Sequence, residues 1–165
     1  MIIGLLDPKS PSNVGSVLRA AGCYQANEVW YTGKRFARAA SYQTDTKDLA
    51  SKIPLRQCDD LLNNLPVDLP VVCVEFVEGA QSLIEFTHPQ NALYIFGPED
   101  GSIPQAIVDQ ADFVVYVPTI GCMNLAATVN VVLYDRLAKS AAVIDHSALI
   151  KNSRDTNNRL KRDKA

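Results

Sequence analysis

The sequence has few of the residues that build metal sites or disulfide frameworks. Its four cysteines are widely spaced and form no C-x-x-C pair, and it contains only two histidines. A structural zinc site is therefore not expected. Cys58 and Cys73 could pair, but reduced thiols in a cytoplasmic enzyme are the better expectation.

Long apolar runs are also missing. No run approaches the roughly 20 residues that span a membrane, so no membrane association is expected. The first residues, Met1 to Asp7, lack a basic start and reach an acidic residue at once, which predicts a first strand and not a signal peptide. With 165 residues, 47% hydrophobic and 21% charged, the chain suits one globular domain.

The chain lacks a strong excess of either charge, since its formal net charge is −2. The charge is unevenly placed, because residues 151–165 carry six basic and two acidic side chains, or +4, which leaves −6 for residues 1–150. We expect one domain over residues 1–150 and a basic, flexible tail over 151–165. The tail either contacts a phosphate backbone or is a solvated terminus.

Strand and helix patterns alternate along the chain. Strands are predicted at 1–6, 27–31, 71–77, 91–96 and 113–117, and helices at 14–23, 59–65, 102–111 and 124–145, with a short helix or turn at 79–86. Ser12 or Asn13 is the expected cap of the first helix. This order predicts an α/β fold with a mostly parallel sheet flanked by helices.

Residues 94–137 form the most informative stretch. They read as strand, glycine turn, helix, strand, glycine turn and helix. Each glycine turn follows the carboxyl end of a strand, where open parallel sheets bind ligands. Two such turns close together in sequence predict one pocket with two walls.

Three segments of the chain closely resemble the motifs of the SpoU (TrmH-type) branch of the SPOUT RNA methyltransferases. They are Asn13-Val14-Gly15-Ser16-Val17-Leu18-Arg19, then Phe96-Gly97-Pro98-Glu99-Asp100-Gly101, and then Val117-Pro118 with Cys122-Met123-Asn124-Leu125. The match is best to the short members that methylate the wobble ribose of tRNA. Two departures stand out: the glycine after Glu99 comes one residue early, and Cys122 replaces the family serine.

The resemblance implies a function and a fold. It implies methyl transfer from S-adenosyl-L-methionine to a ribose 2′-hydroxyl of RNA, with tRNA favoured over rRNA. It also implies a homodimer through the first and last helices and a deep C-terminal trefoil knot. The knot follows from the resemblance alone.

The resemblance also implies the site. The candidate catalytic residues are Arg19, Asn13, Glu99 and Asn124. The candidate cofactor-binding residues are Glu75, Gly97, Val117, Gly121, Cys122 and Met123. Arg19 would grip the phosphate beside the target ribose and stabilise the developing alkoxide, because a guanidinium stays protonated.

Alternative interpretations remain open. A nucleotide- or flavin-binding α/β enzyme fits the fold class, although no G-x-G-x-x-G follows the first strand. A non-catalytic RNA-binding homologue is the other alternative. Lys34, Arg35 and Arg38, interleaved with Phe36 and Tyr42, form either an RNA-contacting loop or an ordinary polar loop.

Overall fold

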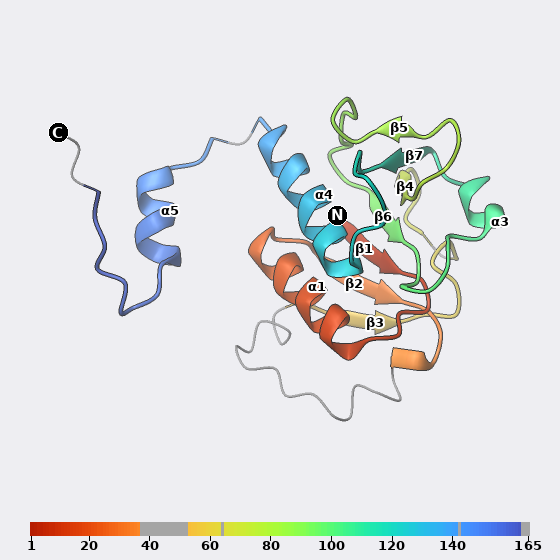
Figure 1. Cartoon of the computed structure of the whole chain (residues 1–165), viewed down its shortest axis with the longest axis horizontal. Coiled ribbons are helices and arrows are strands. Elements are labelled where there is room, and N and C mark those ends of the chain that lie inside the picture. Colours follow the sequence, from red (N-terminus) through yellow and green to blue (C-terminus); the bar gives the residue numbers. More distant parts are fainter. Residues whose placement is uncertain (37–52, 64, 142, 163–165) are drawn as a thin grey trace.

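The computed structural model describes residues 1–36, 53–63, 65–141 and 143–162. Within these residues the strands form one seven-stranded sheet in the order β3-β2-β1-β6-β4-β7-β5, and every recorded pairing is parallel (Figure 1). The strands are β1 (Ile2–Leu5), β2 (Glu28–Tyr31), β3 (Leu55–Gln57), β4 (Val71–Val74), β5 (Gln81–Ser82), β6 (Leu93–Phe96) and β7 (Phe113–Tyr116). The predicted fold class, a mostly parallel sheet flanked by helices, is confirmed.

Two helices, α1 (Pro11–Cys23) and α4 (Leu125–Ala138), lie side by side against one face of the sheet. The buried residues form two clusters, one on each face of the sheet, because successive side chains along a strand point to opposite faces. Ile3 and Leu5 join the core beneath these helices, whereas Gly4 faces Leu61 and Leu93 on the other side. The sheet is therefore covered on both faces, as a parallel sheet requires.

The start of α1 differs from the expectation. Ser10 is the N-cap, with its hydroxyl accepting from the backbone N–H of Asn13 at 3.4 Å, and Pro11 occupies the first turn. The predicted cap at Ser12 or Asn13 is wrong. The earlier cap places Asn13 inside the first turn, where its side chain is available for other contacts.

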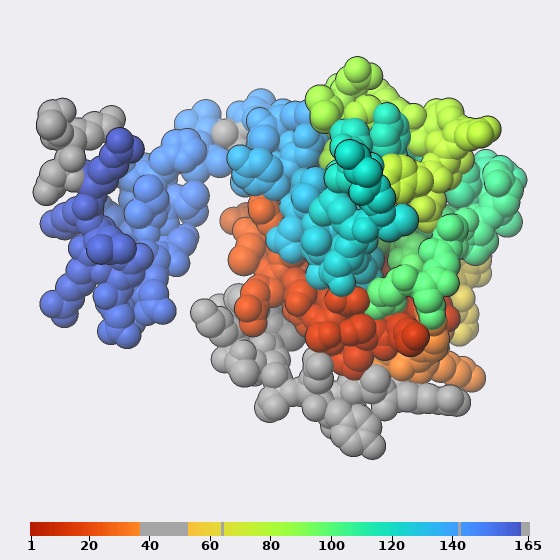
Figure 2. All heavy atoms as spheres, in the orientation of Figure 1, coloured from red at the N-terminus to blue at the C-terminus, as the bar shows by residue number. Residues whose placement is uncertain are grey.

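The last predicted helix is two helices. The first, α4, begins after Asn124, whose side-chain oxygen accepts from the N–H groups of Ala126 and Ala127, and it ends at Ala138 instead of 145. A separate helix, α5 (His146–Ser153), is capped by Asp145. Figures 1 and 2 show α5 and the residues after it as a lobe that stands away from the body.

The remaining differences involve short segments. The predicted helix at 59–65 is absent among its described residues, which form turns around the buried Leu61. The helix predicted at 102–111 is a single turn, α3 (Gln105–Val108), and the short helix or turn at 79–86 contains the strand β5. Short helices gain little cooperativity, so tertiary packing decides such segments. In the described part of the chain, no helix is long and apolar enough to cross a membrane.

Candidate active site

A cavity of about 160 Å³ lies at the carboxyl ends of β4, β6 and β7. Three loops that follow these strands form its walls: the two glycine turns on which the sequence prediction rested, after β6 and β7, and the loop after β4. Five of the six predicted cofactor-binding residues line it, and Gly121 adjoins it in the chain. The lining residues are Val74, Glu75, Phe76, Phe96, Gly97, Pro98, Glu99, Gly101, Tyr116, Val117, Thr119, Cys122, Met123, Leu125 and Thr128.

Glu75 ties two of these loops together. One carboxylate oxygen accepts from the N–H of Ile103 at 3.0 Å, and the other accepts from the N–H of Phe76 at 3.0 Å. A Cβ atom at Gly97 would lie 3.2 Å from the Glu75 carboxylate. Glycine at 97 therefore allows the carboxylate to sit against the backbone of the β6 loop, and a larger residue would crowd the cavity.

The loop after β7 forms the opposite wall. Gly121 has φ +96°, a conformation that favours glycine, and its carbonyl oxygen accepts from the Thr119 hydroxyl at 2.9 Å. This tight turn leads directly to Cys122 and Met123, both of which line the cavity. Gly121 thus shapes the wall through its backbone conformation.

Three of the predicted catalytic residues form a continuous hydrogen-bonded chain. The Asn13 side-chain amide donates to Glu99 at 3.0 Å, and the Asn124 side-chain amide donates to the Asn13 oxygen at 3.0 Å. Glu99 also accepts from the backbone N–H groups of Lys9 and Ser10 at 2.8 and 3.0 Å. The starts of α1 and α4 are therefore joined to the loop after β6.

The contacts of Glu99 define its protonation state. Burial by itself raises the pKa of the Glu99 carboxyl, but the hydrogen bonds from Asn13, Ser10 and Lys9 outweigh burial and bring the pKa below its ordinary value. Glu99 is therefore a carboxylate at neutral pH. It acts as a hydrogen-bond acceptor that orders the loops and not as a general acid.

Arg19 is not brought to this cavity. It lies on an exposed position of α1 and is not among the residues that line the cavity of its own chain. Within its own chain the Glu99 carboxylate accepts from Lys9, Ser10 and Asn13, so it fixes the loop after β6 against the β1–α1 segment. Arg19 therefore does not contact a ligand held within this cavity of its own chain.

Sequence reasoning missed several residues at this site. Phe76 and Tyr116 line the cavity with ring centroids 5.9 Å apart. Both follow or end a predicted strand, and ligands bind at the carboxyl ends of parallel strands, so the sequence could have pointed to them. In the proposed basic loop, Arg35 binds two carboxylates of its own chain and Phe36 packs on Tyr31. Arg38 and Tyr42 lie outside the described residues.

A family model matches residues 1–134, which include all three motifs and the whole sheet. The chain belongs to the SpoU rRNA Methylase family. The family resemblance seen in the motifs is thereby confirmed, together with the prediction of an S-adenosylmethionine-dependent RNA methyltransferase. A comparison with curated proteins yields no match.

Solved structures share the fold of this family member. One, concerned with the 2-OH methylation of C/U34 on tRNA, has a TM-score of 0.73 and 23% identity and covers 84% of this chain and 94% of that one. The TrmH/SpoU tRNA modifying enzyme of A. aeolicus matches with a TM-score of 0.73 and 16% identity. The match covers 84% of this chain and 74% of that enzyme. An AdoMet-bound rRNA methyltransferase from Sinorhizobium meliloti matches with a TM-score of 0.71 and 16% identity. The match covers 86% of this chain and 57% of that protein.

Proposed function

We propose that this family member transfers a methyl group from S-adenosyl-L-methionine to a ribose 2′-hydroxyl of tRNA, and that it works as a homodimer. The observation that carries the proposal is the chain Glu99–Asn13–Asn124. It brings the polar residues of three separate motifs together beside one cavity. Neither a flavin site nor a dinucleotide site requires that arrangement.

Solved structures support tRNA over rRNA. The protein concerned with C/U34 of tRNA is covered over 94% of its length, so nearly its whole architecture has a counterpart here. The Sinorhizobium meliloti rRNA methyltransferase is covered over 57%, which leaves a large part of that protein without a counterpart. Nucleotide 34 of tRNA is accordingly the first acceptor to test.

The cavity suits the cofactor. Apolar side chains such as Val74, Phe96 and Leu125 can hold an adenine, and the Glu75 carboxylate suits a ribose hydroxyl or a positive charge. When bound, S-adenosylmethionine supplies a methyl group activated by a positively charged sulfur. The chain then has to place the acceptor oxygen in line with that methyl group and exclude water. We propose that Asn124, at the end of the hydrogen-bonded chain, contacts the acceptor ribose.

Two observations support a homodimer. The cavity of about 160 Å³ is smaller than the ~300–1,000 Å³ of usual small-molecule sites, so one chain encloses only part of a ligand. On α4, Tyr134 and Leu137 remain 63% and 40% exposed. Covering this face with a second copy through α1 and α4 would bury it and bring Arg19 of one subunit toward the site of the other.

Methyl transfer from labelled S-adenosylmethionine tests the proposal. The purified protein is offered total tRNA and rRNA from cells that lack its gene, and mass spectrometry locates the labelled nucleotide. We expect a 2′-O-methyl nucleotide in tRNA. Label in rRNA alone would contradict the tRNA assignment, and cofactor binding without any transfer would favour the non-catalytic homologue.

Arg19→Ala tests the role of the exposed arginine in the same assay. We expect transfer to be abolished and cofactor affinity to change by less than about threefold, because Arg19 lies outside the cavity. Mixing Arg19→Ala with Gly97→Leu, which blocks the cavity, tests action between subunits. Mixed dimers regain one working site only if Arg19 serves the partner, so mixtures as inactive as the parents would contradict that arrangement.

The C-terminal tail is proposed to contact RNA. Lys151, Arg154, Arg159 and Lys161 are exposed, and the tail carries +4 against −6 for the rest of the chain. Removing residues 151–165 should weaken tRNA binding and flatten its dependence on salt, since fewer counterions are released. A variant in which the basic tail residues are replaced by glutamine controls for chain length. Unchanged affinity and salt dependence in both variants would show that the tail does not bind RNA.

We also propose a cytoplasmic location, which the free cysteines and the proposed tRNA substrate favour.

A further inference from the structure

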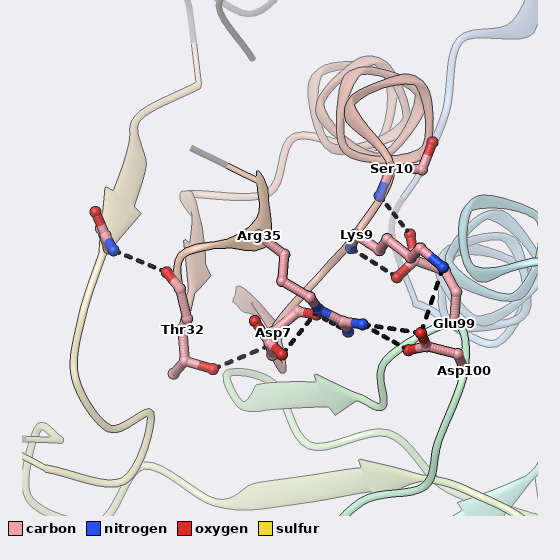
Figure 3. Close-up of polar contacts among 9 residues, drawn as sticks. Asp7, Lys9, Ser10, Thr32, Arg35, Glu99 and Asp100 are labelled. Atoms are coloured by element: carbon pink, nitrogen blue, oxygen red, sulfur yellow. Dashed lines mark hydrogen bonds and ion pairs between the residues drawn. The ribbon is translucent and has the colours of Figure 1, made fainter. Parts of the chain in front are cut away.

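Arg35 spans two acidic residues on two different loops of the site (Figure 3). Its Nε lies 2.8 Å from a carboxylate oxygen of Asp7, and one terminal nitrogen donates to both carboxylate oxygens of Asp100 at 2.8 and 2.9 Å. The other terminal nitrogen and Nε donate to the backbone carbonyl of Asp7. All three guanidinium nitrogens are therefore used within the chain, an arrangement that we call the Arg35 clasp (Asp7, Arg35 and Asp100).

The backbone around the clasp is specialised. Asp7 has φ +38° although it is not glycine, and Gly33 has φ +78°. A Cβ atom at Gly33 would lie only 2.0 Å from the Asp7 carboxylate. Glycine at 33 leaves room for the Asp7 carboxylate beside the turn after β2, and the backbone strain falls on Asp7 in the turn after β1. Strain of this kind persists where the surrounding contacts hold it in place.

The clasp lies directly beside the hydrogen bonds of Glu99. Asp100 follows Glu99 on the loop after β6, and Asp7 precedes Lys9 and Ser10, whose N–H groups donate to Glu99. Side chains therefore join the same two loops in three ways: Arg35 bridges Asp7 and Asp100, the Lys9 ammonium lies 3.6 Å from Asp100, and Glu99 accepts from Lys9 and Ser10. The Glu99 attachment leads on to Asn13 and Asn124, whereas the clasp contacts neither the cavity nor those two residues.

We propose that Arg35 is a positioning residue for methyl transfer: the Arg35 clasp fixes the loop after β6 and so holds Glu99, and through it Asn13 and Asn124, in the reactive arrangement. This inference rests on the function proposed above. Its basis is geometric, since a planar guanidinium that contacts two carboxylates through different nitrogens fixes both the distance and the orientation between them.

The clasp contributes little to the free energy of unfolding. The Arg35 side chain is 34% exposed and that of Asp100 is 48% exposed, so water and salt screen the pairs. A direct grip on an RNA phosphate is also disfavoured while every guanidinium nitrogen donates to Asp7 or Asp100. The role left for the clasp is to hold the two loops in a fixed relative position.

The test compares three clasp variants with a matched control. Arg35→Ala and Asp100→Ala remove opposite partners, and Arg35→Lys keeps the charge but cannot bridge both carboxylates in the same way. Arg56→Ala is the control, because Arg56 is an exposed arginine on β3 that lies over the Trp30 ring at 5.3 Å. The readouts are hydrogen exchange at the amides of Lys9 and Ser10, kcat and KM for tRNA, and Tm.

We expect all three clasp variants to lose protection at the Lys9 and Ser10 amides by about tenfold, since these amides depend on Glu99. We also expect kcat to fall at least about tenfold, because small displacements at a reacting centre are costly. The KM for tRNA and the Tm should change little. The double variant Arg35→Ala/Asp100→Ala should be no worse than either single variant.

Two results would overturn the inference. Loss of tRNA affinity in Arg35→Ala but not in Asp100→Ala would show that Arg35 binds RNA. Wild-type exchange and kcat in the clasp variants, or in Arg35→Lys alone, would show that spanning the carboxylates has no role. Exchange is measured without RNA, so it judges the clasp even if the wild-type protein transfers no methyl group and the proposed function itself fails.

Discussion

The side-chain amide of Asn124 donates to the side-chain oxygen of Asn13 at 3.0 Å, across 111 positions of sequence. This contact joins the first turn of α1 to the N-cap of α4. Because Asn13 also donates to Glu99, one hydrogen-bonded chain links all three sequence motifs. The amide of Asn124 thus has two separable functions, since its oxygen caps a helix and its nitrogen positions Asn13.

Substitutions at Asn124 can separate these functions. Asn124→Asp keeps an oxygen that caps α4 but loses the N–H that donates to Asn13. We expect it to retain stability within about 0.5 kcal/mol while methyl transfer falls at least about tenfold. Asn124→Ala should lose transfer and also about 1 kcal/mol of unfolding free energy. Chemical denaturation and transfer assays check both, and wild-type transfer by Asn124→Asp would argue against the positioning role.

Glu75 is expected to determine cofactor affinity. Glu75→Ala removes the acceptor for the Ile103 N–H and the charge inside the cavity, so binding of S-adenosylmethionine should weaken by about tenfold or more. Glu75→Gln keeps one acceptor and should bind with intermediate affinity. Calorimetric titration measures both against Glu78→Ala, an exposed acid after the same strand. Equal affinity in all variants would reduce Glu75 to a loop contact.

The cysteines should differ in reactivity toward iodoacetamide. Burial, aided by the nearby Glu75 charge, raises the pKa of the Cys73 thiol to about 12, so Cys73 should stay unlabelled in the native protein. Cys23 and Cys122 are exposed and should react. Because Cys122 lines the cavity, S-adenosylmethionine should slow its labelling and leave Cys23 unaffected. Peptide mass spectrometry measures each site, and protection of Cys23 instead would contradict the cavity assignment.

His88 should make the fold sensitive to mild acid. Its side chain is 4% exposed and lies between the Tyr94 hydroxyl and the Asp135 carboxylate, both at 2.8 Å, with Arg136 and Lys139 nearby. Burial lowers the pKa of His88 below its ordinary value, even though the Asp135 hydrogen bond raises it. The neutral ring then donates from Nε2 to Asp135 and accepts from Tyr94 at Nδ1.

Proton linkage gives the direction in which folding stability changes with pH. The unfolded chain binds the His88 proton more readily than the folded chain, so the stability from this group is complete above about pH 6.5 and declines as the pH falls below it. Urea unfolding between pH 5 and 7.5 should show this decline in the wild type and a smaller one in His88→Gln. The matched control is His146→Gln at the exposed start of α5, which should keep the wild-type slope. Equal slopes in all three proteins would exclude His88 as the cause.

Much of the local structure could be predicted because it depends on neighbouring residues. The five main strands follow from short apolar runs bounded by turn residues, and the predicted and observed strands agree within three residues at each end. Helix boundaries were less predictable. Ser12 or Asn13 was the expected cap of α1, but the hydroxyl of Ser10 accepts from the N–H of Asn13 and makes Ser10 the cap.

The sequence alone determined the five main strands, the fold class and the family, because apolar periodicity and the three motifs are local patterns of residue type. The tertiary structure alone decided which polar groups meet. Glu99 faces Asn13, Arg35 spans Asp7 and Asp100, and Arg19 lies outside the cavity of its own chain. The physical reason is that hydrogen bonds and ion pairs act over about 3 Å. Residues far apart in sequence come that close only after the strand order of the sheet has brought their loops to one edge.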